Sequence, residues 1–459
     1  MEAILAIAVL AGLIWGLVLF ARGGLMAGCL VLLLAGCCFG HPFFHLAGGP
    51  IPLTFDRLLW IALLGGYVVA WRQGWTASRR PAASDWTLGV LMLVLLASTL
   101  SHNWRQDGNA PLAHLVFCYV MPVGLYWVAR EIKLTKPSLH LMLVAFAVFA
   151  LYVAVTAVAE VNALWWAVFP RYIADPQYLE FFGRGRGPLL NPVASGYYQA
   201  VGMFATMQLW SPSLRRSGHV IILAALGIIG LGVFCTLTRS VWLGTGLGMM
   251  TIAFLRMPGR YRAPAFGAVL ILGTTVIATQ WERLVAFKRD QALSAREAAE
   301  SMKLRPILAR VAWDMFCDKP LFGCGYGQYM EAQVDYLSDR STELPLSKAR
   351  PYVQHNVFLS LLAETGLVGM SLFTALLAIW TRNAWRLWRD RNLSQIARAE
   401  GLFFLAMMAY YLANAMFQDI SLMAQANMLL FFLGGINEAT SAQFGANRVL
   451  TQEPVSTPE

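Results

Sequence analysis

The residues best suited to chemistry are one histidine and several arginines, all beyond residue 180. His355 ends a basic, proline-containing segment, and a long apolar run follows it directly in RPYVQHNVFLSLLAETGLVG, residues 350–369. An imidazole, with an ordinary pKa of about 6.5, is well suited to take a proton from a hydroxyl group. A histidine beside an apolar run is also a common polar boundary residue. The choice between the two roles depends on its neighbours.

Two short segments carry arginines beside turn-forming residues. In GRGRGPLLNPVASG, residues 183–196, Arg184 and Arg186 alternate with glycines, which allow a backbone to curl around an anion. In TLTRSVWLG, residues 236–244, Arg239 separates two apolar runs. Within one continuous membrane helix this arginine would cost about 3 kcal/mol or more, so we expect a break at the membrane surface. A flexible turn and an arginine extending to the interface are the ordinary alternatives.

A third segment, residues 305–329, contains Arg305 and Arg310 in an amphipathic stretch and ends near the turn GCGYG. The glycine pattern is a weak nucleotide signal, because no strand precedes it. Solvated surface arginines are the alternative here. Arginine binds phosphate through two parallel hydrogen bonds and stays charged. With a histidine base, the set predicts a phosphorylated lipid as substrate.

The polar residues that follow His355 have a different expected role. Glu364 lies nine residues further on, which on a helix places it on the opposite face and about 13 Å away along the axis. We therefore expect Glu364 to stabilise helix packing through a buried hydrogen bond. Asp419, near the end of another apolar run, is a possible orienting group for the histidine.

The composition places these residues in a membrane protein. The chain of 459 residues is 58% hydrophobic and 13% charged, and its apolar runs have the length of a bilayer core. Its net charge of +10 is scattered between these runs, which argues against nucleic-acid binding. We predict an all-α polytopic fold with 12 or 13 transmembrane helices, the first of them retained as a helix. The predicted spans are 3–20, 24–39, 56–72, 86–101, 112–129, 138–159, 193–210, 218–235, 240–255, 263–280, 356–380, 399–417 and 421–437.

The loops predict the orientation of these spans. Short loops rich in arginine and lysine alternate onto one side, which the positive-inside rule assigns to the cytoplasm. Two long segments, 160–192 and 281–355, fall on the opposite side, and the second should be partly helical. The predicted organisation is N-terminal helices (1–159), core helices with both long loops (160–355), C-terminal helices (356–437) and a cytoplasmic tail (438–459).

The 281–355 loop contains an amphipathic helix and two cysteines. Leu304, Leu308, Val311 and Met315 recur at helical spacing, so this helix should lie on the membrane or cap the bundle. The seven cysteines show no metal-binding spacing. A disulfide between Cys317 and Cys324 is left open.

These motifs resemble one known family. HNVFLSLLAETGLVG, residues 355–369, resembles the O-antigen ligase and polymerase signature H-N-x-x-L-x-x-L-A-E-x-G-x-x-G, in which Asn356, Glu364 and Gly366 belong to the structural part. GRGRGPLLNP is similar to the Arg-bearing loop of that family, with Arg184 at the motif position.

The other two segments resemble further parts of the same family. TLTRSVWLG is similar to its Thr-x-Ser-Arg helix end, with Thr238 in place of the usual Ser. The segment from Arg305 to the P-L-F-G-C-G turn is similar to its Arg-to-P-L-x-G-x-G region, with Ala309 where a Trp is common. The resemblance covers residues from about 180 to 370.

The resemblance implies an inverting glycosyltransferase that needs no metal or other cofactor. It would transfer a glycan from undecaprenyl diphosphate to a hydroxyl of lipid A-core, at the periplasmic face of a bacterial inner membrane. His355 would be the general base. The residues implied to bind the diphosphate are Arg184, Arg239 and Arg305, with Arg186 and Arg310 as additional candidates. A polymerase acting on a growing glycan, an O-oligosaccharyltransferase acting on protein and, in another class, a lipid-glycan transporter are the alternatives.

Overall fold

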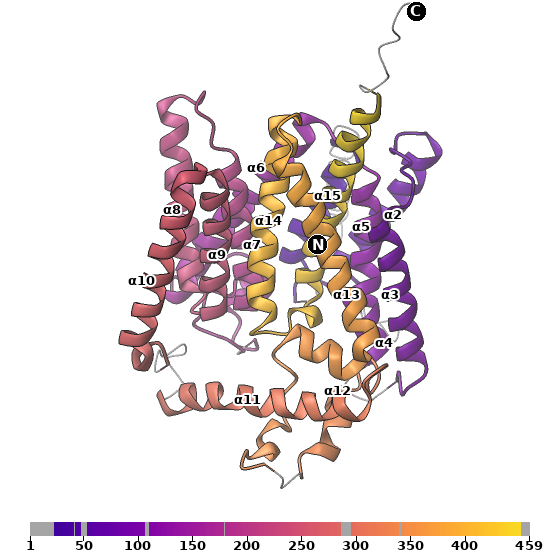
Figure 1. The fold of residues 1–459 in the computed structure, drawn as a ribbon, viewed down its shortest axis with the longest axis vertical. Helices are drawn as coiled ribbons and strands as arrows, with labels where there is room; N and C mark the ends of the chain where they lie inside the picture. The colour runs from indigo at the N-terminus through magenta and orange to yellow at the C-terminus, as the bar shows by residue number, and fades with distance from the viewer. Residues whose placement is uncertain are drawn as a thin grey trace, which may run out of the picture.

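The protein is a bundle of long helices with one helix lying across its end (Figure 1). The computed structural model describes residues 23–40, 42–46, 53–105, 110–178, 180–285, 295–338 and 342–450. Within them, strands form only the two-stranded antiparallel pair of β1 (His45–Leu46) and β2 (Leu53–Thr54). The predicted all-α class is confirmed.

The bundle helices run alternately up and down. They are Gly23–Cys38, α2 (Phe55–Arg72), α3 (Ala83–Leu100), α4 (Pro111–Leu115) continuing through the π-helical η1 (Val116–Val120) into α5 (Met121–Arg130), α6 (Lys136–Val161), α7 (Pro192–Gln208), α8 (Arg216–Cys235), α9 (Arg239–Arg256), α10 (Gly259–Val285), α13 (Val357–Arg389), α14 (Gln395–Ala415) and α15 (Ala424–Leu450). The long loops hold η2 (Trp165–Ala167), η3 (Arg171–Ala174), η4 (Gly187–Leu189), α11 (Ala295–Asp318), α12 (Tyr329–Ala332), η5 (Gln333–Tyr336) and η6 (Leu346–Ala349), and η7 (Ile420–Leu422) lies between α14 and α15.

Helices occupy the predicted membrane spans. Every predicted span after the first coincides with a helix, and span 3–20 lies outside the described residues. In the described part of the chain, six helices are long and apolar enough to cross a membrane: α3, the α4–α5 unit, α6, α8, α13 and α14. The central α7 is almost wholly buried and carries polar side chains such as Gln199, which lowers its hydropathy. Together these helices describe a multi-pass membrane protein.

Exposed aromatic side chains mark both ends of the bundle. At the end that holds the short basic loops, Trp71, Trp75 and Trp86 are 57%, 62% and 69% exposed. At the opposite end, Trp166 and Trp313 are 77% and 50% exposed. Tryptophan is enriched at both interfaces of membrane proteins, so the two groups are consistent with the two membrane surfaces.

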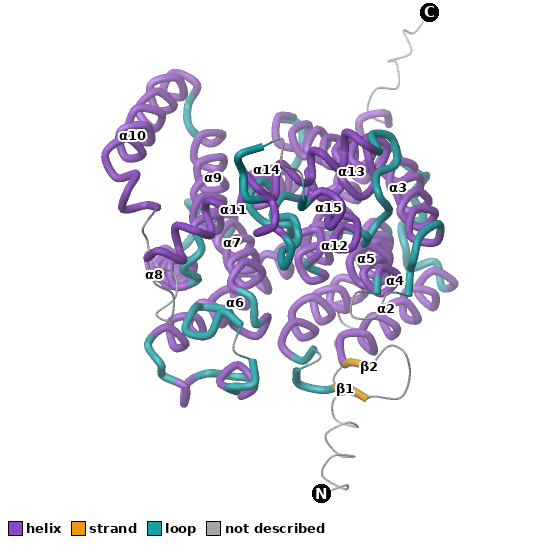
Figure 2. Tube along the Cα trace, turned by 90° about the horizontal axis from the view of Figure 1, so that it is seen from below, coloured by secondary structure: helices purple, strands orange, loops and turns teal. Residues whose placement is uncertain are grey.

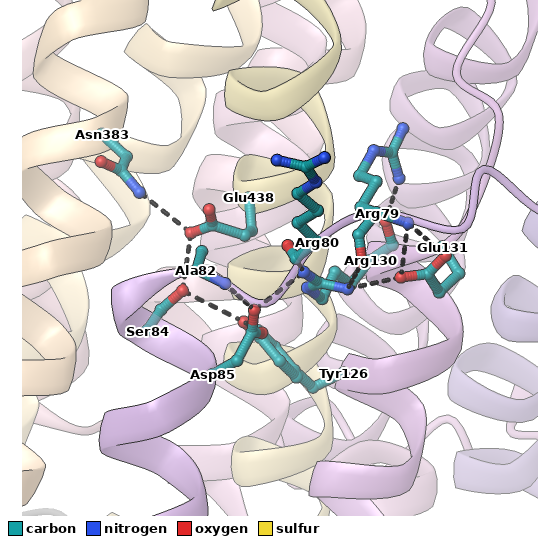
Figure 3. Close-up of polar contacts among 10 residues, drawn as sticks. All are labelled: Arg79, Arg80, Ala82, Ser84, Asp85, Tyr126, Arg130, Glu131, Asn383 and Glu438. Carbon is teal, nitrogen blue, oxygen red and sulfur yellow. Dashed lines mark hydrogen bonds and ion pairs between the residues drawn. The ribbon is translucent and has the colours of Figure 1, made fainter.

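A buried polar network joins four helices at the basic end (Figure 3). Arg130 of α5 forms an ion pair with Asp85 of α3 at 2.8 Å. Glu438 of α15 accepts hydrogen bonds from Ser84 at 2.8 Å and from Asn383 of α13 at 2.9 Å. Helix α15 therefore continues beyond residue 437, where the sequence placed the end of the last span, because its next turn is held by these side chains.

At the other end, α11 caps the bundle (Figures 1 and 2). The predicted apolar face is confirmed: Leu308, Val311 and Met315 are buried and pack with η6 and with Ala363 of α13. This arrangement places the amphipathic helix between the bundle and residues 329–338 and 342–350. Cys317 and Cys324 are both free thiols.

Candidate active site

The hairpin between α8 and α9 carries Arg239 at its tip. Helix α8 ends at Cys235 and α9 begins at Arg239, so the predicted break between the two apolar runs is confirmed. Leu237 in the connection has a φ of 49°, the left-handed conformation of a tight turn. Arg239 is half-buried at the α11 end of the bundle, as the first residue of its helix.

Arg184 lies against the same hairpin. Its Nε donates to the carbonyl oxygen of Thr236 at 3.3 Å, and Nη2 donates to Oγ1 of Thr238 at 2.5 Å. A cation at this position interacts favourably with the free carbonyl groups at the end of α8. The contacts bring Arg184 next to Arg239, 55 residues further along the chain.

Arg186 has a different environment, although only one glycine separates it from Arg184. Its side chain is buried and donates to the carbonyl oxygens of Glu180 and Ile173, each at 2.8 Å. It also pairs with Glu160 of α6 at 3.5 Å, and the same carboxylate accepts the N–H of Gly187 at 2.6 Å. Arg186 therefore fixes the shape of the loop that holds Arg184.

The two arginines of α11 point in different directions. Arg305 is half-buried, with its guanidinium 5.3 Å from the centre of the Phe417 ring. Burial, together with the nearby charge of Arg239, lowers the pKa of Arg305. The structure thus brings Arg239 and Arg305 close enough to repel each other. Arg310 is exposed and pairs with Asp314 at 2.8 Å along the outer surface of the helix.

His355 lies immediately before α13, in a segment held by its neighbours. Asn356 is the N-cap of α13, and its side-chain oxygen accepts the N–H groups of Phe358 at 2.9 Å and Leu359 at 3.0 Å. The side-chain nitrogen Nδ2 of Asn356 donates to the carbonyl oxygen of Met416 at 3.2 Å. The asparagine therefore sets both the start of the helix and its contact with the α14–α15 loop.

Gln354, on the other side of the histidine, connects this segment to α11. Its Nε2 donates to the carbonyl oxygen of Leu308 at 3.1 Å, and its Oε1 accepts the N–H of His355 at 2.7 Å. Leu308 is three residues, or about one helical turn, beyond Arg305. The two neighbours of His355 thus bind different elements: Gln354 binds α11, and Asn356 binds Met416 at the end of α14.

A chain of contacts connects the candidate residues at one end of the bundle. Thr238 accepts a hydrogen bond from Arg184 and is the residue before Arg239. The charge of Arg239 in turn lowers the pKa of Arg305. The ring of Phe417 lies against Arg305. The preceding residue, Met416, accepts a hydrogen bond from Asn356. Segments distant in sequence therefore converge where Figure 2 shows α11 and the loops nearest the viewer.

The P-L-F-G-C-G turn pairs with a kink in α13. At Gly366 the backbone has φ 62° and ψ −162°, so α13 consists of two arms. Leu367 N–H donates to the carbonyl oxygen of Pro320 at 2.8 Å, and Val368 N–H donates to that of Leu321 at 3.2 Å. On the other side of the kink, the turn donates two N–H groups to carbonyl oxygens of α13. We call this pairing of residues 320–325 with residues 363–368 the loop–kink contact.

Glu364 is part of the loop–kink contact. Its backbone oxygen accepts the N–H of Gly325 at 2.9 Å, and its carboxylate accepts the N–H of Tyr329 at 3.2 Å. A Cβ on Gly323 would lie 2.4 Å from the backbone carbon of Glu364, so no larger residue fits there. The glycines of this turn permit close backbone approach to α13. Sequence reasoning missed the pairing, although glycines in both motifs were a signal for it.

Among the residues that the structure describes, no group of three His, Cys, Asp or Glu side chains is placed to hold a metal ion. The charged groups that define the site are arginines. This arrangement can bind an anion at the end of the bundle, close to a histidine that can accept a proton.

The fold and this site define a multi-pass membrane protein with a cationic site at one end of its bundle. Residues 222–374 match the family model described as O-antigen ligase, so this part of the chain is similar to that family. The matched range includes Arg239, Arg305 and His355, whereas Arg184 lies outside it. No curated protein matches the chain.

Proposed function

We propose that this protein transfers a glycan from undecaprenyl diphosphate to a hydroxyl group of an acceptor glycolipid, lipid A-core. The observation that carries the proposal is the convergence of Arg184, Arg239 and Arg305 beside the segment that holds His355. The family match supports an enzyme of the glycan ligase or polymerase type.

In the proposed reaction, His355 takes the proton of the acceptor hydroxyl. The hydroxyl oxygen attacks the anomeric carbon from the side opposite the diphosphate, so the configuration inverts. The bond between the anomeric carbon and the diphosphate oxygen breaks, and both electrons leave with the carrier. His355 then releases its proton to solvent. A positioned base contributes about 10²–10⁴ in rate.

The arginines stabilise the negative charge that develops on the diphosphate. Arg239 and Arg305 repel each other in the free protein, and a bound diphosphate relieves this repulsion. Because the charges are already in place, little reorganisation is needed during the reaction. Arg186 and Arg310 are given other roles: Arg186 shapes the loop, and Arg310 pairs with Asp314 on the outer face.

We assign the site to the periplasmic side of the bacterial inner membrane. Arg79 and Arg80 lie in the short loop between α2 and α3, at the opposite end of the bundle, and positively charged short loops are retained in the cytoplasm. The site end would then face the compartment where a glycan on a lipid carrier can meet its acceptor.

The test is transfer by purified protein in vesicles, with lipid-linked glycan and lipid A-core. We expect His355→Ala to lose at least about 100-fold in rate while remaining folded and inserted. His219→Ala is the matched control, since His219 is a half-buried histidine near the start of α8, at the basic end. Undiminished transfer by His355→Ala would exclude the base assignment.

The size of the product distinguishes the alternatives. One addition to lipid A-core indicates a ligase, whereas a ladder on the carrier indicates a polymerase. Modification of a serine or threonine in a protein acceptor would indicate an O-oligosaccharyltransferase. These outcomes share the same donor chemistry and differ only in the acceptor.

A further inference from the structure

The turn after α11 presents large apolar side chains at the surface. Leu321 and Phe322 are 58% and 65% exposed, and Trp313 on α11 is 50% exposed. Leu321 and Phe322 belong to none of the predicted membrane spans. Exposed apolar groups of this size on adjacent residues indicate a surface that contacts something other than water.

The hydrogen bonds of the turn determine its depth relative to the membrane. Leu321 accepts the N–H of Val368, and Pro320 accepts that of Leu367, in the first residues of the second arm of α13. This arm, residues 367–389, is about 34 Å long at 1.5 Å per residue, enough to cross a hydrocarbon core of about 30 Å. Because the second arm alone is long enough, the membrane boundary can lie at the kink, which is at the level of the turn.

The surroundings of the turn leave it little freedom to move away. A Cβ on Gly366 would lie 2.3 Å from the backbone carbon of Leu321, which shows how closely the two backbones pack. Leu367, on the membrane-crossing arm, is itself 42% exposed. The exposed side chains of the turn thus continue the lipid-facing surface of α13.

We propose that the turn formed by residues 319–322 inserts into the lipid leaflet at the α11 end, with Leu321 and Phe322 among the acyl chains. Lys319 is exposed beside them and can reach lipid phosphate groups, as lysines do at membrane interfaces. Trp313 lies at the interface. The insertion holds the C-terminal end of α11 at the level of the lipid head groups, and it does not depend on the reaction that the protein catalyses.

The experiment places an environment-sensitive fluorophore on the turn of the full-length protein. Cys317 is the exposed cysteine among seven, and the other six are buried, so Cys317→Ser gives a background without exposed thiols. Phe322→Cys is labelled with a nitrobenzoxadiazole probe and reconstituted in phosphatidylcholine and phosphatidylglycerol vesicles. Val334→Cys is the matched control: Val334 is 45% exposed, on η5, in the segment away from the second arm of α13.

We expect lipids with a nitroxide on the acyl chain to quench the probe at 322 about threefold or more strongly than the probe at 334, because the proposal places position 322 among the acyl chains. Aqueous iodide should show the reverse order. Equal quenching at the two positions would overturn the proposal. Protection of position 322 from both quenchers would also overturn it, since that result indicates a protein partner. Leu321→Cys provides a second labelled position if Phe322→Cys does not fold.

Discussion

Replacing Gly366 by alanine tests the loop–kink contact directly. With φ 62° and ψ −162°, Gly366 occupies a backbone region that is almost exclusive to glycine. A Cβ would lie 2.3 Å from both the backbone carbon and the carbonyl oxygen of Leu321. Because both groups belong to backbone, neither can turn aside, and the loop must separate from the helix.

The size of the effect follows from what is lost. An alanine in this conformation costs about 1–3 kcal/mol of backbone strain. Separation of the loop also breaks the hydrogen bonds from Leu367 and Val368, each contributing about 1 kcal/mol. We therefore expect Gly366→Ala to lower the free energy of unfolding by about 3–5 kcal/mol.

The assay is thermal unfolding in detergent, followed by the fluorescence of the 16 tryptophans. Gly246→Ala is the matched control: Gly246 lies within α9, and a Cβ there meets nothing within 4 Å. The control should be neutral or stabilised by up to about 1 kcal/mol, the helix propensity of alanine over glycine. Equal melting temperatures for Gly366→Ala and Gly246→Ala would refute the reasoning.

Three further variants or treatments test the site and its supports. Arg239→Lys should lose transfer activity, because the ammonium group of lysine cannot replace a guanidinium that binds phosphate through two parallel hydrogen bonds. Undiminished turnover would argue against diphosphate binding at this position. Arg186→Met should lower the free energy of unfolding by about 3–5 kcal/mol, since it leaves Glu160 buried without its ion pair. The double variant Arg186→Met with Glu160→Gln should melt at a higher temperature than Arg186→Met alone. At pH 8.5 maleimide should label Cys317 and not Cys324, because burial raises the pKa of the Cys324 thiol to about 12 and keeps it protonated; mass spectrometry of the labelled peptides checks both.

Features that depend on local pattern could be predicted from the sequence. The apolar runs predicted the bundle helices, and the spacing of Leu308, Val311 and Met315 predicted the buried face of α11. The cost of placing Arg239 within a membrane helix predicted the break between α8 and α9. In each case the relevant interaction lies within one element or at its end.

Features that depend on partners distant in the sequence could not be predicted from it. Arg184 and Arg186 share the same glycine-rich setting, yet their environments differ because one meets Thr238 and the other meets Glu160. Neither partner is near them in sequence. The role of the glycines in the GCGYG turn was likewise ambiguous from the sequence. They pack against the backbone of α13 and do not form a ligand-binding loop.

The loop–kink contact also constrains how the site can move. Arg305 is on α11, which leads into the turn, and His355 lies two residues before the first arm of α13, which begins at Val357 and ends at Gly366. Because backbone hydrogen bonds join the turn to both sides of the kink, any displacement of α11 must carry the first arm with it. The same hydrogen bonds hold the second arm to the turn, so α11 and both arms of α13 form one rigid unit around Gly366. Opening the site to admit a lipid carrier would then move the α8–α9 hairpin relative to this unit, while the separation between Arg305 and His355 stayed nearly constant.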